Sequence, residues 1–136
     1  MASHITFEHQ RLHLSLRHHE AQPEGDFRDL FGETFLLHSR LLLEFFYGEE
    51  KRKDDAFAIH YLDSKSTWKP NKPSWFEEHC TRCNKLLVHL SYRRVGYKKD
   101  NQMKWSLRDK AAHLDKEWIA FISALPPERQ AWFRFP

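Results

Sequence analysis

Residues 26–48 read DFRDLFGETFLLHSRLLLEFFYG, and this stretch decides the fold. Asp26 is a favourable N-cap and Gly48 is a typical stop signal, so the pattern predicts one helix from Asp26 to about Tyr47. Apolar residues lie almost all round its helical wheel, which predicts a central position in the fold. These residues are Phe27, Leu30, Phe31, Phe35, Leu37, Leu41, Leu42, Phe45 and Phe46.

A single polar stripe interrupts this apolar surface. Glu33, Arg40 and Glu44 follow one another at spacings of seven and four residues, so they share one helical face. Arg40 and Glu44 form an ordinary i to i+4 ion pair in the simplest interpretation. On a helix that is otherwise apolar, the pair is also a candidate to support a functional site or a dimer contact.

Two further helices are predicted downstream. Ser74 followed by Glu77 matches the capping-box pattern and predicts a helix from Trp75 to about Tyr92. The next helix runs from about Lys104 to Leu125, where two prolines stop it. Its apolar residues recur in steps of four and three, as in a bundle seam. They are Leu107, Ala111, Leu114, Trp118, Phe121 and Leu125.

The remaining segments are shorter or ambiguous. Residues 56–62 read as a short helix, and residues 128–133 read as a terminal turn that lays Trp132 and Phe133 on the bundle. Residues 1–25 fit either a short strand or a loose helix, and we treat them as a poorly defined N-terminal extension. Residues 26–136 are then a single domain, and we expect an all-α, irregular four-helix bundle.

Composition limits the class of protein. A chain of 136 residues and 16.5 kDa can build one hydrophobic core but not two domains of ordinary size. No apolar run approaches the length of a membrane span, and the N-terminus lacks the apolar segment of a signal peptide. Cys80 and Cys83 are the only cysteines and are expected to be free thiols in a reducing compartment. We therefore expect a cytoplasmic protein without membrane contact.

Positive charge is concentrated in one part of the chain. Residues 82–110 contain nine Lys or Arg and two Asp, whereas residues 1–81 contain ten Lys or Arg and fourteen Asp or Glu. An acidic partner such as RNA is therefore plausible at residues 82–110.

Arg82 and His89 are the candidate catalytic residues. Seven helical steps leave them about 20° apart on one face. An imidazole can take the proton of a ribose 2′-hydroxyl or protonate the leaving 5′-oxygen, and a guanidinium can hold the scissile phosphate. This pair suits RNA cleavage without a metal. The candidate RNA-binding residues around it are Asn84, Lys85, Arg93, Arg94, Lys98 and Lys99.

An Arg followed by four to six residues and then a His, late in a small helical bundle, resembles the active-site motif of HEPN domains. These are nucleotide-binding and ribonuclease domains of toxin–antitoxin and phage-defence systems. The stretches from His38 to Phe46 and from Asn84 to Leu90 are also similar to small bacterial proteins of that fold. The family favours a polar residue directly after the Arg, whereas Cys83 stands there in this chain.

The resemblance covers about residues 26–125 and implies a four-helix core with metal-independent RNA cleavage. It also implies a homodimer that brings two Arg/His pairs together across a two-fold axis. The leading hypothesis is a ribonuclease or RNA-binding protein of a bacterial stress, toxin–antitoxin or phage-defence system. The alternative is a non-catalytic interaction module, an adaptor or partner subunit, in which Arg82 and His89 are ordinary surface or interface residues.

No metal site or cofactor is expected. His79, Cys80 and Cys83 have the pattern of half a zinc site, but no second cysteine pair completes it and both thiols fall on the predicted core face. His9, His13 and the pair His18 and His19 are other candidate ligands. They lie in the least defined segment, so an accidental cluster is the better interpretation.

Overall fold

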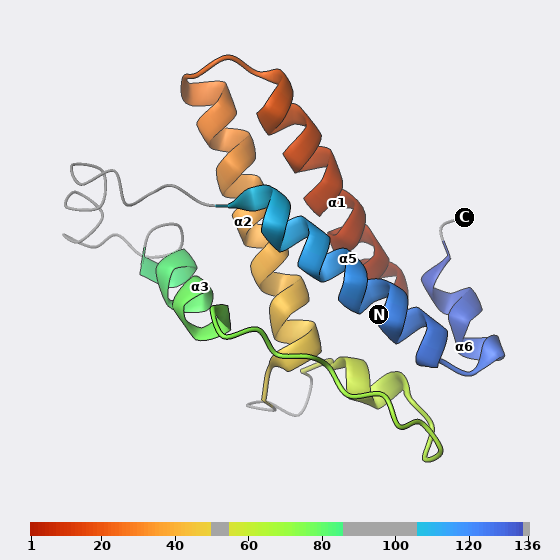
Figure 1. Ribbon diagram of the computed structural model, residues 1–136. Helices are drawn as coiled ribbons and strands as arrows, with labels where there is room; N and C mark the ends of the chain where they lie inside the picture. Colours follow the sequence, from red (N-terminus) through yellow and green to blue (C-terminus); the bar gives the residue numbers. More distant parts are fainter. Residues whose placement is uncertain (50–54, 86–105, 135–136) are drawn as a thin grey trace.

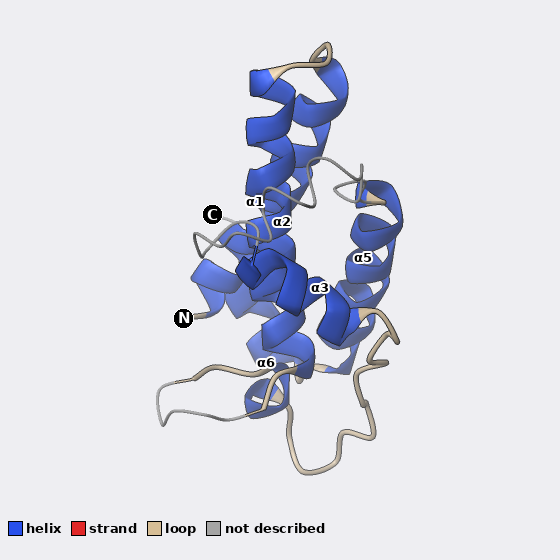
Figure 2. Cartoon of the chain, turned by 90° about the vertical axis from the view of Figure 1, so that its left-hand side faces the viewer, coloured by secondary structure: helices blue, strands red, loops and turns tan. Residues whose placement is uncertain are grey.

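The computed structural model describes residues 1–49, 55–85 and 106–134, and all regular structure in these ranges is helical (Figures 1 and 2). The all-α prediction is therefore confirmed for this part of the chain. None of the helices in the described ranges combines the length and the apolar character that crossing a membrane requires.

The first two helices form an antiparallel hairpin (Figure 1). Helix α1 spans Ala2–Ala21 and helix α2 spans Asp26–Tyr47, and Gly25 joins them with a φ of 143° that favours glycine. Of the two conformations considered for residues 1–25, the structure has the helix. Leu12 and Leu16 pack into the core, whereas Leu14, which would share their face in a strand, does not.

Helix α2 has the predicted bounds, with Gly48 as its C-cap. Gly25 is the N-cap and no side chain caps this end, so Asp26 is the first helical residue rather than the cap. Phe35, Leu42 and Leu43 are fully buried. The expectation of a wholly central helix is wrong on one face, because Phe27, Leu30, Leu37 and Leu41 are between 42% and 72% exposed.

Helix α3 spans Phe76–Cys83 and packs on α2. The predicted capping box does not form, because Trp75 is the N-cap and Glu77 pairs instead with Lys72 at 2.7 Å. Phe76 and Cys83 are buried as predicted, whereas Cys80 is only half-buried. The predicted continuation toward Tyr92 lies beyond residue 85, outside the described residues.

Helix α5 spans Leu107–Ala124 and packs across both α1 and α2. The predicted seam is confirmed, since all its members are buried except Trp118, which is half-buried. After it come α6 (Pro127–Gln130) and the 3₁₀ turn η3 (Ala131–Phe133). Phe133 is buried as expected, but Trp132 is exposed, because a tight turn cannot aim both rings at the bundle.

The expected short helix at residues 56–62 is present as a 3₁₀ turn, η1 (Ala58–Tyr61). Arg129 anchors the end of the chain to it, because its guanidinium donates to the carbonyl oxygens of Tyr61 and Leu62 at 2.7 and 2.9 Å. Hydrogen bonds therefore connect α6 to η1.

Candidate functional site

Arg82 lies in the last turn of α3, and its side chain is 19% exposed. A guanidinium nitrogen of Arg82 stands 3.8 Å from Oε1 of Glu78, one helical turn earlier. The Nε atom of Arg82 is buried, so protein covers part of the guanidinium as well as the aliphatic part of the side chain. This is the setting expected for an arginine that binds an external anion and equally for one in a local ion pair.

His79 lies one turn before Arg82 and is 2% exposed. The Ser39 hydroxyl donates to the carbonyl oxygen of Leu36 at 2.8 Å, so its oxygen is left to accept a hydrogen from Nε2 of His79 at 3.0 Å. The Cys83 sulfur lies 3.5 Å from the same nitrogen. These contacts make His79 the polar centre of the α2 and α3 interface.

The pKa of His79 is lowered to about 3, first by burial and then by the positive charges of Lys110, Arg82 and Arg40. The imidazole is therefore neutral at physiological pH. The three positive charges come from three different helices, and each disfavours protonation of the His79 ring. We refer to Arg40, Arg82 and Lys110 as the cationic cluster.

The other two members of the cationic cluster are held by specific contacts. Nε and Nη2 of Arg40 both donate to Oε1 of Glu44 at 3.1 Å, so the predicted i to i+4 pair is present. Nζ of Lys110 lies 4.2 Å from the centre of the Trp75 ring, a cation–π contact. Burial lowers the pKa of Lys110, and the nearby Arg82 lowers it further. A bound anion would relieve this repulsion.

The structure describes only part of the predicted site. Asn84 and Lys85 follow α3 directly and are both half-buried. Outside the described residues lie His89, Arg93, Arg94, Lys98 and Lys99. The predicted pairing of Arg82 with His89 therefore stays a prediction.

Two residues of this region were not assigned to it by the sequence analysis, which considered His79 only as a zinc ligand. His79 shares a helical face with Phe76 and Cys83, because it lies three residues after the first and four before the second. This spacing indicates burial, but the polar side chain was not assigned to the core. Lys110 lies on α5, far from Arg82 in the chain, and no local pattern links the two.

Neither thiol is suited to act as a nucleophile or metal ligand. Burial raises the pKa of Cys80 to about 11 and that of Cys83 to about 12, so both remain protonated at neutral pH. The interpretation as a small buried group is confirmed for Cys83, whereas Cys80 is half-buried against the core.

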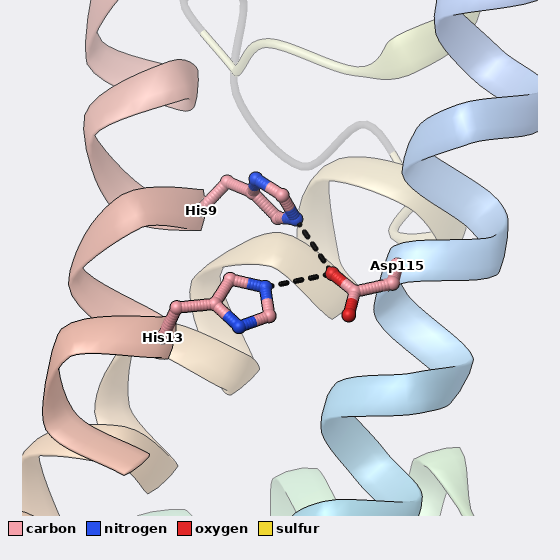
Figure 3. Close-up of side chains that lie close together, drawn as sticks. All are labelled: His9, His13 and Asp115. Carbon is pink, nitrogen blue, oxygen red and sulfur yellow. Dashed lines mark hydrogen bonds and ion pairs between the residues drawn. The ribbon is translucent and has the colours of Figure 1, made fainter. Parts of the chain in front are cut away.

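A second group of polar side chains joins α1 to α5 (Figure 3). Nε2 of His9 and Nε2 of His13 lie 2.9 and 2.7 Å from the same oxygen, Oδ1 of Asp115. The His9 ring is stacked on Trp118 with centroids 4.4 Å apart and planes 4° from parallel. Burial lowers the pKa of His9, while Asp115 opposes that shift. Sequence analysis named both histidines but not Asp115, because 102 residues separate Asp115 from His13.

Comparisons with known proteins found no family model, curated protein or solved structure that matches this chain.

Proposed function

We propose that the protein binds RNA at the cationic cluster and cleaves it without a metal ion, as a HEPN-like ribonuclease or RNA-binding protein. The observation that carries this proposal is that Arg40, Arg82 and Lys110 come from three helices and that their positive charges all lower the pKa of His79. RNA presents closely spaced negative charges, so it is the polyanion that such a cluster suits. The excess of basic residues over 82–110 supports the same partner.

In this proposal Arg82 holds the scissile phosphate through its guanidinium and neutralises the charge that develops on the phosphate oxygens. His89 removes the proton of the ribose 2′-hydroxyl, and the 2′-oxygen attacks phosphorus as the bond to the 5′-oxygen breaks. The protonated imidazole then returns the proton to the 5′-oxygen. Asn84, Lys85, Arg93, Arg94, Lys98 and Lys99 contribute contacts along the RNA. The proposal includes an irregular four-helix, HEPN-like core and a cytoplasmic role in stress, toxin–antitoxin or phage-defence systems.

Binding of fluorescently labelled single-stranded RNA, measured by anisotropy over a range of salt concentrations, tests the first step. Arg82→Gln should weaken binding for all RNA sequences alike and reduce the salt slope by about one. Lys65→Gln is the matched control, because it removes the same charge from an exposed loop. Equal affinity of the wild type and Arg82→Gln would contradict the proposal.

Cleavage of RNA in the presence of a chelator tests the second step. His89→Ala should abolish cleavage and preserve the helical circular dichroism and the RNA affinity. If the wild type binds RNA but does not cleave it, the protein is an RNA-binding module of the same architecture and not a nuclease.

A second candidate function is an interaction module, and one observation favours it. Phe27, Leu30, Leu37 and Leu41 leave an exposed apolar stripe along α2. Large apolar side chains gathered on one face mark a protein-binding surface more often than an ordinary solvent face. We propose that a second copy of the chain covers this stripe, so the protein is a homodimer whether or not it cleaves RNA.

A further inference from the structure

We propose that His9, His13 and Asp115 form a Zn²⁺ site that links α1 to α5. Their donor atoms all lie within 4.8 Å of one another, and Figure 3 shows the two imidazoles and the carboxylate converging on one point. This is the one group of three or more such side chains at that spacing in the part of the chain that the structure describes. The proposal is independent of RNA binding, because none of the three residues belongs to the cationic cluster.

Helical geometry brings the two imidazoles together. His9 and His13 are four residues apart on α1 and therefore share a face, with ring centroids 4.9 Å apart. Each ring directs Nε2, and not Nδ1, toward Asp115. Two histidines at i and i+4 on a helix are the arrangement by which zinc enzymes hold their metal. The third donor comes from a separate helix, so the metal would join two elements.

The surroundings hold the donors in place before a metal arrives. Trp118 lies parallel to the His9 ring and fixes its orientation, and Trp118 itself packs against Phe121 and Phe133 of the core. A rigid support of this kind lowers the entropic cost of assembling a site. The His9 side chain is 18% exposed, and those of His13 and Asp115 are 37% and 38% exposed. The site is therefore open on one side, where a metal can enter and water can complete its coordination.

The donor set selects the metal class. Two imidazole nitrogens and one carboxylate oxygen match three-ligand zinc sites, which keep a further position for water. Donor atoms around a tetrahedral Zn²⁺ stand about 3.3 Å apart. The nitrogen to oxygen distances of 2.7 and 2.9 Å are shorter, so these pairs need to separate by roughly half an ångström. No two of the three donor atoms are more than 4.8 Å apart, so the widest pair needs to approach by at most about 1.5 Å.

No covalent or redox step is involved. In the metal-free cluster both Nε2 atoms carry the hydrogen that they donate to the carboxylate oxygen. In the metal-bound site each neutral imidazole carries its hydrogen on Nδ1 and offers the Nε2 lone pair to the metal. The proton count of the two rings is unchanged.

Isothermal titration of the full-length, untagged chain with ZnCl₂ tests the proposal. The wild type should bind one Zn²⁺ per chain, and His13→Asn and Asp115→Asn should each weaken this binding by at least about 100-fold. His4→Asn is the matched control, because it removes an exposed histidine from the same helix and should bind as the wild type does. Circular dichroism of each variant shows whether it is folded. Asp115→Asn keeps an oxygen that can accept a hydrogen bond, so it preserves the α1 to α5 contact.

Nitrogen-15 shifts of the histidine rings provide a second measurement. Zn²⁺ should move the Nε2 signals of His9 and His13 and leave those of His4 unchanged. Absence of one-to-one binding by the wild type would overturn the proposal, as would unchanged binding by folded His13→Asn or Asp115→Asn. The cluster would then be a metal-free, hydrogen-bonded link between the helices. RNA binding by the cationic cluster is measured separately and can fail or succeed independently.

Discussion

His79 shows how a single buried side chain can couple folding to pH. Its ring lies among apolar neighbours and beside the cationic cluster, and both surroundings oppose a positive charge on it. The neutral ring is nevertheless well accommodated, because Ser39 accepts its hydrogen. The native state is therefore compatible with the neutral imidazole and is destabilised when that ring is protonated.

Acidification should destabilise the fold through this residue. The unfolded chain binds a proton at His79 below a pKa of about 6.5, whereas the folded chain does so only near a pKa of about 3. Stability is therefore unaffected by this group above about pH 6.5 and falls as the pH drops from there toward about 3. The expected loss is about 3 kcal/mol by about pH 4. Urea unfolding from about pH 7 to about pH 4 measures it.

His79→Gln is the control for that experiment, because the amide can donate to Ser39 but does not titrate. Its free energy of unfolding should be lower than that of the wild type at neutral pH and should change less with acidification. His9 and His113 also have lowered pKa values, so some pH dependence will remain in the variant. If acidification lowered the free energy of unfolding equally in the wild type and in His79→Gln, His79 would not be the cause.

At the residue scale, sequence reasoning found side chains whose role is local and missed those whose role depends on distant partners. The Arg40 and Glu44 pair was predictable because four residues separate its members. The burial of His79 was not assigned, because charge and packing from α2 and α5 decide it.

Among the elements, α2 has the most distinctive surface. Phe27, Leu30, Thr34, Leu37 and Leu41 follow spacings of three and four, which place them within about 80° on the helix. This is the repeat of helices that pack in pairs. In an antiparallel pair centred between Thr34 and Leu37, Leu30 of each copy faces Leu41 of the other, and Phe27 faces the position of Glu44.

The charged flank of α2 suits the same pairing. Glu33 and Arg40 occupy equivalent positions seven residues apart along the edge of the stripe. An antiparallel partner places Arg40 of the second copy, which pairs with Glu44 in its own chain, on the same side as Glu33 of the first, and the two-fold axis repeats this arrangement. In a parallel pair this flank of each helix would lie on opposite sides of the interface, so Glu33 and Arg40 would not meet.

Leu37→Asp should therefore disrupt the proposed dimer. The two-fold axis introduces two carboxylates near the centre of the interface, where burial of charge is costly. Sedimentation velocity should give twice the chain mass of 16.5 kDa for the wild type and a monomer for the variant. Ile119→Asp is the control, because it changes an exposed apolar residue on α5 and should remain dimeric. A monomeric wild type or a dimeric Leu37→Asp would contradict the homodimer.

At the element scale, helix ends were predicted best where glycine or proline determines them. Gly48 ends α2 at the predicted residue, and the two prolines after Leu125 end α5. The start of α3 was mispredicted, because capping depends on which partner Glu77 finds, and Lys72 competes for it. The distribution of apolar residues in the sequence also identified α2 as an apolar helix. It did not show which face of α2 the neighbouring helices leave exposed.

The described part of the molecule is held together by one aromatic cluster. Phe121 is fully buried, and its ring contacts rings from α2, η1, the connection before α3, α5 and η3. The rings are those of Phe45, Phe46, Tyr61, Trp68, Trp118 and Phe133. Edge-to-face packing of this kind adds to the gain from burial alone. Segments far apart in the chain therefore share one core.

Phe121→Ala should destabilise the whole chain and not one segment. Removing a fully buried aromatic ring costs about 3–5 kcal/mol, a large share of the stability of a small domain. Guanidinium unfolding followed by far-UV circular dichroism and by tryptophan fluorescence should give one coincident transition at a lower midpoint. Ile119→Ala, two residues away and exposed, should change the midpoint little. Separate transitions for the two signals would argue against a single cooperative core.

At the scale of the whole molecule, the sequence predicted the helical class but not the spatial neighbours. Residues 1–25 were expected to be an extension, yet α1 lies along α2 and supplies two members of the proposed zinc site. The contacts of His9 and His13 with Asp115 connect positions about a hundred residues apart. No local sequence pattern predicts contacts of this kind.

The Thr6 hydroxyl, near the start of α1, is buried between two acceptors, the carbonyl oxygen of Ala2 at 3.2 Å within the helix and that of Phe133 at 3.3 Å. During synthesis on the ribosome, α1 emerges early but lacks the Phe133 acceptor until η3 has left the exit tunnel. The N-terminal hairpin can assemble beforehand, whereas its final docking waits for the last part of the chain. Translation that stalls before Phe133 would therefore leave the apolar side of α1 accessible to chaperones and proteases.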